Sequence, residues 1–423
     1  MTFNSKSFLP HLATRRSLLL GSGALFAWAY MPKLAQAEGR DPRLLVIVLR
    51  GALDGLATVA PVSDPDWIKL RGDQALRLDG DNAALALDNM FAINPAMPNF
   101  YRLYQAKQAA VVHAVASPYR ERSHFDGQDV LESGLINPGT SDSGWLNRAW
   151  HALTPADRVG SSQAFAVGPI TPLIARGPAP VMSWTPSRLQ PASNDTMDRL
   201  LDLYRHTDPA LGRALQERGA LAAIAKGEAM GKNIQMKPAK VAATPGIPGA
   251  AVRAYFTEAA GAAAKFMARA DGPRVGALAF DGWDTHAQEG AAHGRLSALL
   301  GALDGAFGAI ESGMGAAWKE TAVVVVTEFG RTARINGTEG TDHGTATVAL
   351  LAGGAIAGGR VIADWPGVSE SALYQGRDLK PTTDLRAVLK GLLKDHLRAD
   401  ERALADVVFP GSNVVKPMTG LLV

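Results

Sequence analysis

Short, unbroken runs of apolar residues recur along this chain and predict strands that are buried on both faces of a sheet. Residues 44–49 read Leu-Leu-Val-Ile-Val-Leu, and similar runs cover residues 109–116 and 323–326. Because the apolar residues in these runs are continuous rather than alternating, we expect all three strands to lie in the interior of the sheet. Two further strands are predicted at residues 274–280 and 347–352.

Segments with helical composition or helical apolar spacing lie between several of these strands. They cover residues 124–134, 195–230, 250–270, 287–312 and 383–397. Alternating strands and helices predict the α/β class, with a mostly parallel central sheet and helices on both faces. Residues 231–249 contain scattered prolines among small residues, which predicts a surface loop.

The first 37 residues have the pattern of a twin-arginine signal peptide. Arg15 and Arg16 precede an apolar stretch, and the tripeptide 35–37, Ala-Gln-Ala, fits a cleavage site. The apolar stretch has about a dozen residues, whereas a spanning helix needs roughly 20, so we expect no retained membrane anchor. We therefore predict a signal peptide at 1–37 and a single mature domain at 38–423. The twin-arginine export machinery would carry the protein to the periplasm or the medium.

Charge and cysteine content narrow the candidate functions. The chain carries 43 basic and 40 acidic residues, and removal of the basic signal peptide leaves the two nearly balanced. Bulk charge therefore gives no support to a nucleic-acid partner. The chain contains no cysteine, which excludes disulfides, iron–sulfur clusters and thiolate zinc sites. Any metal must be held by carboxylate, imidazole, hydroxyl or water ligands.

Polar residues gather next to the predicted strands, at the places where open α/β sheets bind ligands. They are Asp54 after the first strand, Arg122 and Ser123 after the second, Asp284 and His286 after 274–280, Glu328 and Arg331 after 323–326, and Asp342 and His343 before 347–352. Each position also has a purely structural explanation. The aspartates fit turns or helix caps, Ser123 fits a helix cap, and the arginines fit ion pairs with nearby acids.

Together these residues predict a divalent metal site, because carboxylates and imidazoles recur at several strand ends in a chain without thiols. A bound ion would polarise an ester oxygen and lower the pKa of water, which favours a hydrolase. Ser123 is the candidate nucleophile, because backbone amides at a helix N-terminus favour an anion. Arg122 and Arg331 would hold phosphate or sulfate oxygens.

Five motifs give the chain a resemblance to a known family. They are residues 49–56, Leu-Arg-Gly-Ala-Leu-Asp-Gly-Leu; 122–126, Arg-Ser-His-Phe-Asp; 284–286, Asp-Thr-His; 327–332, Thr-Glu-Phe-Gly-Arg-Thr; and 342–344, Asp-His-Gly. With them the chain resembles the secreted family catalogued as domain of unknown function 1501, in the alkaline-phosphatase and sulfatase superfamily. The resemblance covers residues from about 44 to 365. It implies an alkaline-phosphatase-like α/β/α sandwich with a metal-binding rim.

The resemblance also implies roles for individual residues. Ser123 would be the nucleophile, and Asp284 and His286 would lie where an acid and a histidine share a metal. Phe329 stands where superfamily phosphatases carry a histidine ligand, so a two-zinc site does not carry over. The metal would be divalent, with zinc, calcium and magnesium all open, and its candidate ligands are Asp54, Asp284, His286, Glu328, Asp342 and His343.

Three functions remain open from the sequence. The first is an exported metal-dependent hydrolase that acts on small phosphate or sulfate esters. The second is a non-catalytic periplasmic binding or assembly protein that keeps the fold and possibly one metal, and Phe329 favours it. The third is an enzyme without metal that uses His343 or His286 as general base, and its activity would survive chelation. Metal content and the effect of changing Ser123 discriminate between them.

Overall fold

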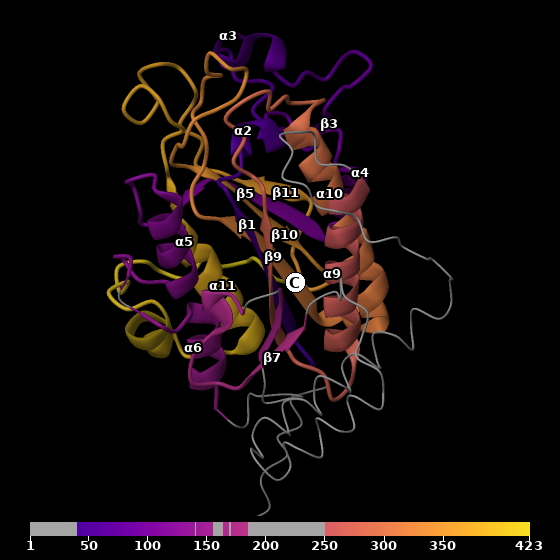
Figure 1. Cartoon of the computed structure of the whole chain (residues 1–423), viewed down its shortest axis with the longest axis vertical. Helices are drawn as coiled ribbons and strands as arrows, with labels where there is room; N and C mark the ends of the chain where they lie inside the picture. Colours follow the sequence, from indigo (N-terminus) through magenta and orange to yellow (C-terminus); the bar gives the residue numbers. More distant parts are fainter. Residues whose placement is uncertain (1–39, 140, 155–163, 169–170, 185–249) are drawn as a thin grey trace, which may run out of the picture.

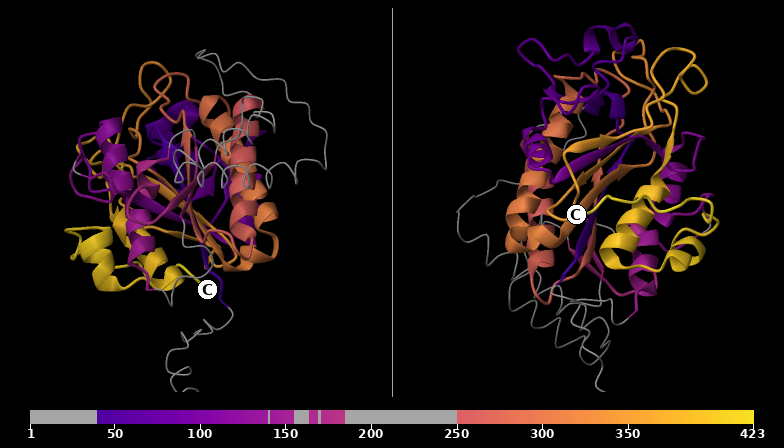
Figure 2. Two further views of the ribbon diagram at one scale, coloured as in Figure 1. Left: turned by 60° about the horizontal axis from the view of Figure 1, so that its bottom comes forward. Right: turned by 180° about the vertical axis from the view of Figure 1, so that it is seen from behind.

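The computed structural model describes residues 40–139, 141–154, 164–168, 171–184 and 250–423. The predicted signal peptide, the predicted helix at 195–230 and the predicted loop at 231–249 lie outside the described residues. These three features therefore stay predictions. Figures 1 and 2 show the described segments in colour.

A nine-stranded sheet forms the centre of the molecule (Figure 1). In spatial order its strands are β11 (Arg360–Ile362), β5 (Ala109–Ala116), β10 (Thr347–Ala352), β9 (Thr321–Thr327), β1 (Arg43–Arg50), β8 (Val275–Asp281), β6 (Ala164–Val167) and β7 (Val181–Trp184), and β12 (Thr383–Asp384) pairs with β5. β1 is parallel to both β8 and β9, whereas β10 is antiparallel to β5 and β9. The predicted mostly parallel α/β sheet is confirmed.

Helices cover both faces of the sheet, as predicted (Figures 1 and 2). One face is packed by α4 (Pro98–Gln105), α9 (Ala250–Ala268) and α10 (Arg295–Met314), and the other by α5 (His124–Ser133), α6 (Trp145–Ala152) and α11 (Leu385–Leu397). The predicted helices at 124–134, 250–270 and 383–397 correspond to α5, α9 and α11. Together the layers form an α/β/α sandwich around two apolar cores.

β1 shows why its apolar residues are continuous in the sequence. Its odd-numbered residues from Leu45 to Leu49 belong to the core under α9 and α10, and its even-numbered residues from Leu44 to Val48 belong to the core under α11. Successive side chains of a strand point to opposite faces, so a strand covered on both sides needs apolar residues at every position.

α10 begins later than the predicted residue 287. Its N-cap is Gly294, whose φ of 108° is rarely adopted by residues with a side chain. The residues before it form a loop in which the backbone N–H of Glu289 donates to the carbonyl of Glu339 at 3.0 Å. This long-range pairing overrides the helical composition of residues 287–294.

The remaining described elements are short. A separate antiparallel sheet has the order β2 (Val59–Ala60), β4 (Ala92–Ile93) and β3 (Leu85–Ala86). The short helices are α2 (Gly55–Thr58), α3 (Trp67–Arg71), η1 (Gly72–Gln74), η2 (Leu173–Ala175), η3 (Gly315–Glu320), α12 (Glu401–Ala403) and η4 (Leu404–Val408). Within the described residues, the apolar stretch of each helix falls short of what crossing a membrane requires.

Candidate metal centre

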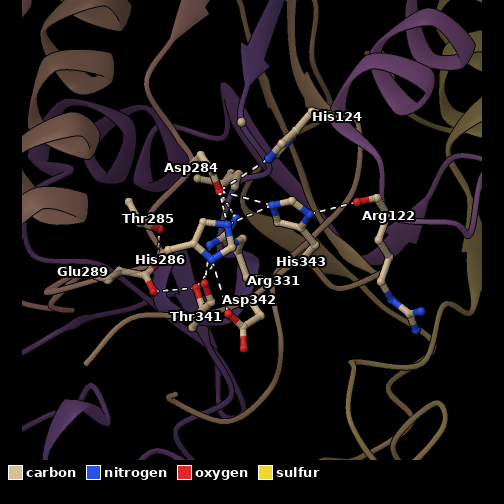
Figure 3. A network of polar contacts seen from close by, with 12 residues as sticks. Arg122, His124, Asp284, Thr285, His286, Glu289, Arg331, Thr341, Asp342 and His343 are labelled. Carbon is tan, nitrogen blue, oxygen red and sulfur yellow. Dashed lines mark hydrogen bonds and ion pairs between the residues drawn. The ribbon is translucent and has the colours of Figure 1, made fainter. Parts of the chain in front are cut away.

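Loops from five strands meet at one edge of the sheet. β1, β8 and β9 are parallel neighbours, so their carboxyl ends lie together. β10 is antiparallel to β9 and β5, so β10 begins and β5 ends at the same edge. Ligands in open α/β sheets bind at this edge. Figure 3 shows the polar side chains that the loops bring together.

Three imidazoles surround one carboxylate oxygen at this edge (Figure 3). Oδ1 of Asp284 lies 3.0 Å from Nε2 of His286 and 3.4 Å from Nε2 of both His124 and His343. The Nε2 atoms of His286 and His343 are 3.0 Å apart. Within the described residues, His124, Asp284 and His343 have the spacing of metal ligands. His286 joins this group through its contacts with Asp284 and His343.

Each imidazole is held from behind through its Nδ1 atom. The pairs are His124 with the carboxylate of Glu328 at 2.8 Å, His343 with the backbone carbonyl of Arg122 at 2.8 Å, and His286 with the carboxylate of Asp342 at 3.3 Å. Carbonyl and ionised carboxylate oxygens only accept hydrogen bonds, so each Nδ1 carries a proton, and in the neutral ring Nε2 presents a lone pair. Metal-binding histidines have this arrangement.

The inward-facing atoms are suited to a cation. The Nε2 atoms of His286 and His343 face each other, and Nε2 of His124 is buried without a hydrogen-bond partner among the described residues. Such an arrangement is unfavourable unless a proton or a metal ion satisfies the lone pairs. Imidazole nitrogens with a single carboxylate oxygen are a typical donor set for zinc and other first-row transition ions. The residues present therefore fit a metal ion.

The charges around the cluster keep the carboxylates ionised. Burial opposes ionisation of Asp284, but its contacts with His343 and Arg331 outweigh burial and lower the pKa of Asp284 well below the usual range. Burial likewise opposes ionisation of Glu328, but hydrogen bonds, first among them that of His124, lower the pKa of Glu328. The same hydrogen bond raises the pKa of His124. A proton and a metal ion would therefore compete for Nε2 of His124.

A buried polar network supports Asp284 from the interior. Nη1 of Arg331 donates to Oδ1 of Asp284 at 2.5 Å, and Nε of Arg331 donates to the hydroxyl of Thr341 at 3.1 Å. That hydroxyl donates to Glu289 at 2.6 Å, and the hydroxyl of Thr285 donates to the other oxygen of Glu289 at 2.8 Å. Burial is the largest cause that raises the pKa of Glu289 to about 8. The orientation of Asp284 thus depends on groups that lie behind it.

Two residues shape the walls of the cluster. Gly51 has a φ of 118°, and a Cβ there would lie 2.5 Å from the backbone nitrogen of Asp284. The loops after β1 and β8 can approach this closely only because Gly51 has no side chain. Phe329 stacks on His124, with ring centroids 5.1 Å apart, and its ring lies 5.4 Å from that of His343. His124 and His343 therefore face an apolar wall on this side of the cluster.

The structure brings most, but not all, of the predicted ligands together. The residues that lie in the cluster or directly behind it are Asp284, His286, Glu328, Asp342 and His343. Asp54 lies elsewhere: its side chain accepts a hydrogen bond from the N–H of Ala57 at 3.0 Å, as the N-cap of α2, and pairs with Arg71 at 2.6 Å. Both of its oxygens are used inside the protein, in a helix cap and an ion pair.

The three predicted catalytic residues have different surroundings. Arg331 is fully buried and faces protein groups. The guanidinium of Arg122 points away from the imidazoles (Figure 3) and pairs with Asp378. Ser123 is the N-cap of α5, directly before His124, and its hydroxyl makes no capping hydrogen bond. Arg122 is thus directed away from the cluster, whereas Arg331 bonds to Oδ1 of Asp284 within it. The hydroxyl of Ser123 is not used to cap its helix.

Two functional residues were missed by the sequence reasoning. His124 lies in the motif 122–126, and a histidine at the start of a helix that follows a buried strand was a usable signal. The sequence pattern instead favours the adjacent Ser123, whose hydroxyl offers a nucleophile. Glu289 lies in a segment predicted as helix, and no local pattern indicates that it is buried beside Thr341.

Comparison with known proteins places the chain in a family without an assigned activity. A model of the family described as "Protein of unknown function (DUF1501)" matches residues 41–408. No curated protein matches the chain.

Several solved structures are similar to this one, all at low identity. Ps i-CgsB, crystallised in complex with k-i-k-neocarrahexaose, is 12% identical, with a TM-score of 0.43, covering 89% of this chain and 78% of that chain. The phosphonate monoester hydrolase of Agrobacterium radiobacter is 13% identical, with a TM-score of 0.37, covering 85% and 74%. The alkaline phosphatase from the Antarctic bacterium TAB5 is 12% identical, with a TM-score of 0.33, covering 74% and 91%.

Proposed function

We propose that this chain, which belongs to the DUF1501 family of proteins of unknown function, is an exported metal-dependent hydrolase of phosphate or sulfate esters. The observation that carries the proposal is the convergence of three imidazole Nε2 atoms on Oδ1 of Asp284. Each imidazole has its Nδ1 atom bonded to an acceptor behind it. A single buried histidine with one hydrogen-bond partner would be an ordinary core residue. Three histidines that are each held this way and face the same carboxylate support a set of metal ligands.

The donor set favours one of the metals that the sequence left open. His124, His286, His343 and Asp284 would hold the ion. Imidazole nitrogens suit zinc and other first-row transition ions, whereas calcium and magnesium prefer oxygen ligands. When bound, a divalent ion with a single carboxylate ligand keeps net positive charge, polarises the oxygen of an anionic ester and lowers the pKa of water.

The protein's own groups supply orientation and a nucleophile. Ser123 lies at the N-terminus of the ten-residue helix α5, where the helix dipole and free backbone amides favour the negative charge of an alkoxide or a phosphate. Arg331 holds Asp284 from the buried side at 2.5 Å. Phe329, which is buried against the imidazoles, keeps water away from that side of the cluster. In this proposal Arg331 orients a ligand and does not itself contact the ester.

The first test is elemental analysis of protein purified after native export. The wild type should carry about one tightly bound transition ion per chain, and the double variant Asp284→Ala, His286→Ala should lose it. His293→Ala is the matched control, because His293 is an exposed histidine near the same loop and is not part of the cluster. Wild-type protein without metal, folded as judged by circular dichroism, would remove the basis of the proposal.

The second test is hydrolysis of nitrophenyl phosphate, bis-nitrophenyl phosphate and nitrophenyl sulfate by metal-loaded protein. Turnover should be lost on chelation and restored by zinc, and Ser123→Ala should abolish it while metal remains bound. Turnover that survives chelation would support a metal-free enzyme with His343 or His286 as general base.

A non-catalytic binding or assembly protein is the second candidate function. One observation favours it: Arg122 and Arg331, the predicted anion-binding residues, both pair with carboxylates of the protein itself. Metal-loaded wild type that hydrolyses none of the esters would favour this candidate.

A further inference from the structure

The carbonyl that supports His343 belongs to a residue with an uncommon backbone conformation. Nδ1 of His343 lies 2.8 Å from the backbone oxygen of Arg122, and Arg122 has a φ of 60°. Residues with a side chain rarely adopt this left-handed region. Such a conformation persists only where the surrounding structure holds it. The direction of the carbonyl, and with it the orientation of His343, therefore depends on what holds Arg122.

A buried carboxylate holds Arg122. Its Nε and Nη2 atoms donate to Oδ2 of Asp378 at 3.0 and 2.8 Å. The side chain of Asp378 is fully buried, whereas that of Arg122 is 21% exposed. Charge-assisted hydrogen bonds to a buried acceptor are the strong kind. Two bonds from one guanidinium to one oxygen fix the side chain of Arg122 and limit rotation of its backbone.

Asp378 is in turn fixed to the segment that carries Arg331. Its backbone forms a β-bridge with Thr332, and its backbone N–H and carbonyl both pair with Tyr374, at 3.1 and 2.9 Å. Arg331, the neighbour of Thr332, forms a bridge with His343. Hydrogen bonds therefore connect the carboxylate of Asp378, through Arg122, to the imidazole of His343.

We infer that Arg122 and Asp378 act as positioning residues that orient His343 as a metal ligand through the carbonyl of Arg122. The inference rests on the metal site of the proposed function, and it gives Arg122 a different task from binding ester oxygens. It also brings in Asp378, which lies far along the chain from the other site residues. Groups behind a ligand of this kind typically change metal affinity roughly 10- to 100-fold when they are altered.

Asp378→Asn is the variant that tests the inference, because it keeps the size of the side chain and removes its charge. The full mature chain would be stripped of metal and titrated with Co²⁺, whose visible absorption reports the ligand geometry, and then with Zn²⁺. We expect the dissociation constants to rise roughly 10- to 100-fold and the Co²⁺ spectrum to change. Arg122→Ala should have a similar effect, and the double variant should be no worse than either single variant, because both act through one contact.

Two control variants separate positioning from general destabilisation. Gln375→Ala removes the other side-chain contact of Arg122, a hydrogen bond of 2.7 Å at the exposed end of the guanidinium. Asp384→Asn weakens a partly buried ion pair with Arg386 at the N-cap of α11. Both controls should bind Co²⁺ with the wild-type constant and spectrum.

The outcomes distinguish this inference from the proposed function. Unchanged Co²⁺ affinity and spectrum in Asp378→Asn would overturn the inference alone, as would a loss of affinity that Asp384→Asn reproduces at equal thermal stability. Tight metal binding by the wild type without ester hydrolysis would overturn the hydrolase alone. Wild-type protein that binds neither ion would overturn the metal site and this inference together.

Discussion

Two aspartates that follow neighbouring parallel strands have opposite surroundings. Asp54 follows β1 and pairs with Arg71 at 2.6 Å, and Asp284 follows β8 and pairs with Arg331 at 2.5 Å. The side chain of Asp54 is 1% exposed and that of Asp284 is 39% exposed. Asp54 also caps a helix, whereas Asp284 faces three imidazoles. An aspartate paired with a buried arginine can therefore either stabilise the fold or belong to a candidate site. The other groups around its carboxylate decide which role it has.

The largest loss of unfolding free energy should come from removing the charge of Asp54 in the buried Asp54–Arg71 pair. Asp54→Asn leaves Arg71 without its counter-ion, and breaking a buried ion pair typically costs about 3–5 kcal/mol of the free energy of unfolding. Asp284→Asn should cost less in metal-free protein, because Asp284 is partly solvated and Arg331 keeps its bonds to Thr341. Urea unfolding of both variants without metal measures the difference. An equal loss in the two variants would contradict the comparison.

Bound metal should stabilise the protein only when Asp284, the acid of the Asp284–Arg331 pair, is intact. A ligand present at about 100 times its dissociation constant stabilises the folded state by about 2.7 kcal/mol. We expect a shift of this size for the wild type and for Asp54→Asn in zinc, and none for Asp284→Asn. Thermal unfolding with and without zinc measures it. If Asp54→Asn remained folded and lost the shift, Asp54 would belong to the metal site after all.

Glu289 is influenced by the charge of Asp54 and bonds to Thr341 beside Arg331. Its titration should make the stability of the protein depend on pH. Burial, followed by the charge of Asp54, raises the pKa of Glu289 to about 8, from 4.5 for an ordinary glutamate. A raised pKa means that the folded state holds this proton more tightly than the unfolded chain does. The associated stability is complete below about pH 4.5 and is lost as the pH rises through about 8.

Glu289→Gln removes this titration and tests its direction. Between pH 6 and 9 the wild type should lose more unfolding free energy than Glu289→Gln does, as measured by urea unfolding at each pH. Parallel pH profiles for the two proteins would show that Glu289 does not titrate in this range.

The smallest stability effect is expected at Ser123. Its hydroxyl makes no capping hydrogen bond, so Ser123→Ala should change the free energy of unfolding by no more than about 0.5 kcal/mol. Ester turnover should nevertheless disappear under the proposed function. A clear destabilisation would assign Ser123 to the helix cap, and turnover retained at the wild-type rate would exclude it as the nucleophile.

The central strands could be predicted because their environment is simple. Both faces are covered in five strands, β1, β5, β8, β9 and β10. Their burial is therefore visible in the sequence as continuous apolar runs. The start of α10 could not be predicted in the same way. Glu289 leaves the helical pattern because its backbone bonds to Glu339, and that partner is not visible in a local window.

The site was predicted in part for a related reason. Asp284 and His286 follow β8, so the carboxyl-end rule for parallel strands places them at this edge. His343 precedes β10 and reaches the same edge because β10 runs antiparallel to β9. Asp54 satisfies the same rule and yet pairs with Arg71, because a short helix turns its side chain towards the interior. Whether an aspartate at a strand end becomes a candidate ligand or an ion-pair partner depends on its neighbours in the folded protein. The spacing of residues in the sequence does not reveal those neighbours.

β10 alone runs antiparallel to its neighbours among the described strands of the central sheet. Glu328, Arg331, Asp342 and His343 therefore all belong to one connection, residues 328–346, between two hydrogen-bonded strands. The entropy lost in closing a loop grows with its length, so this connection can order as soon as the β9–β10 hairpin forms. His124 and Asp284 come from distant parts of the chain, so we expect their arrival to be the slower step when the site assembles during folding.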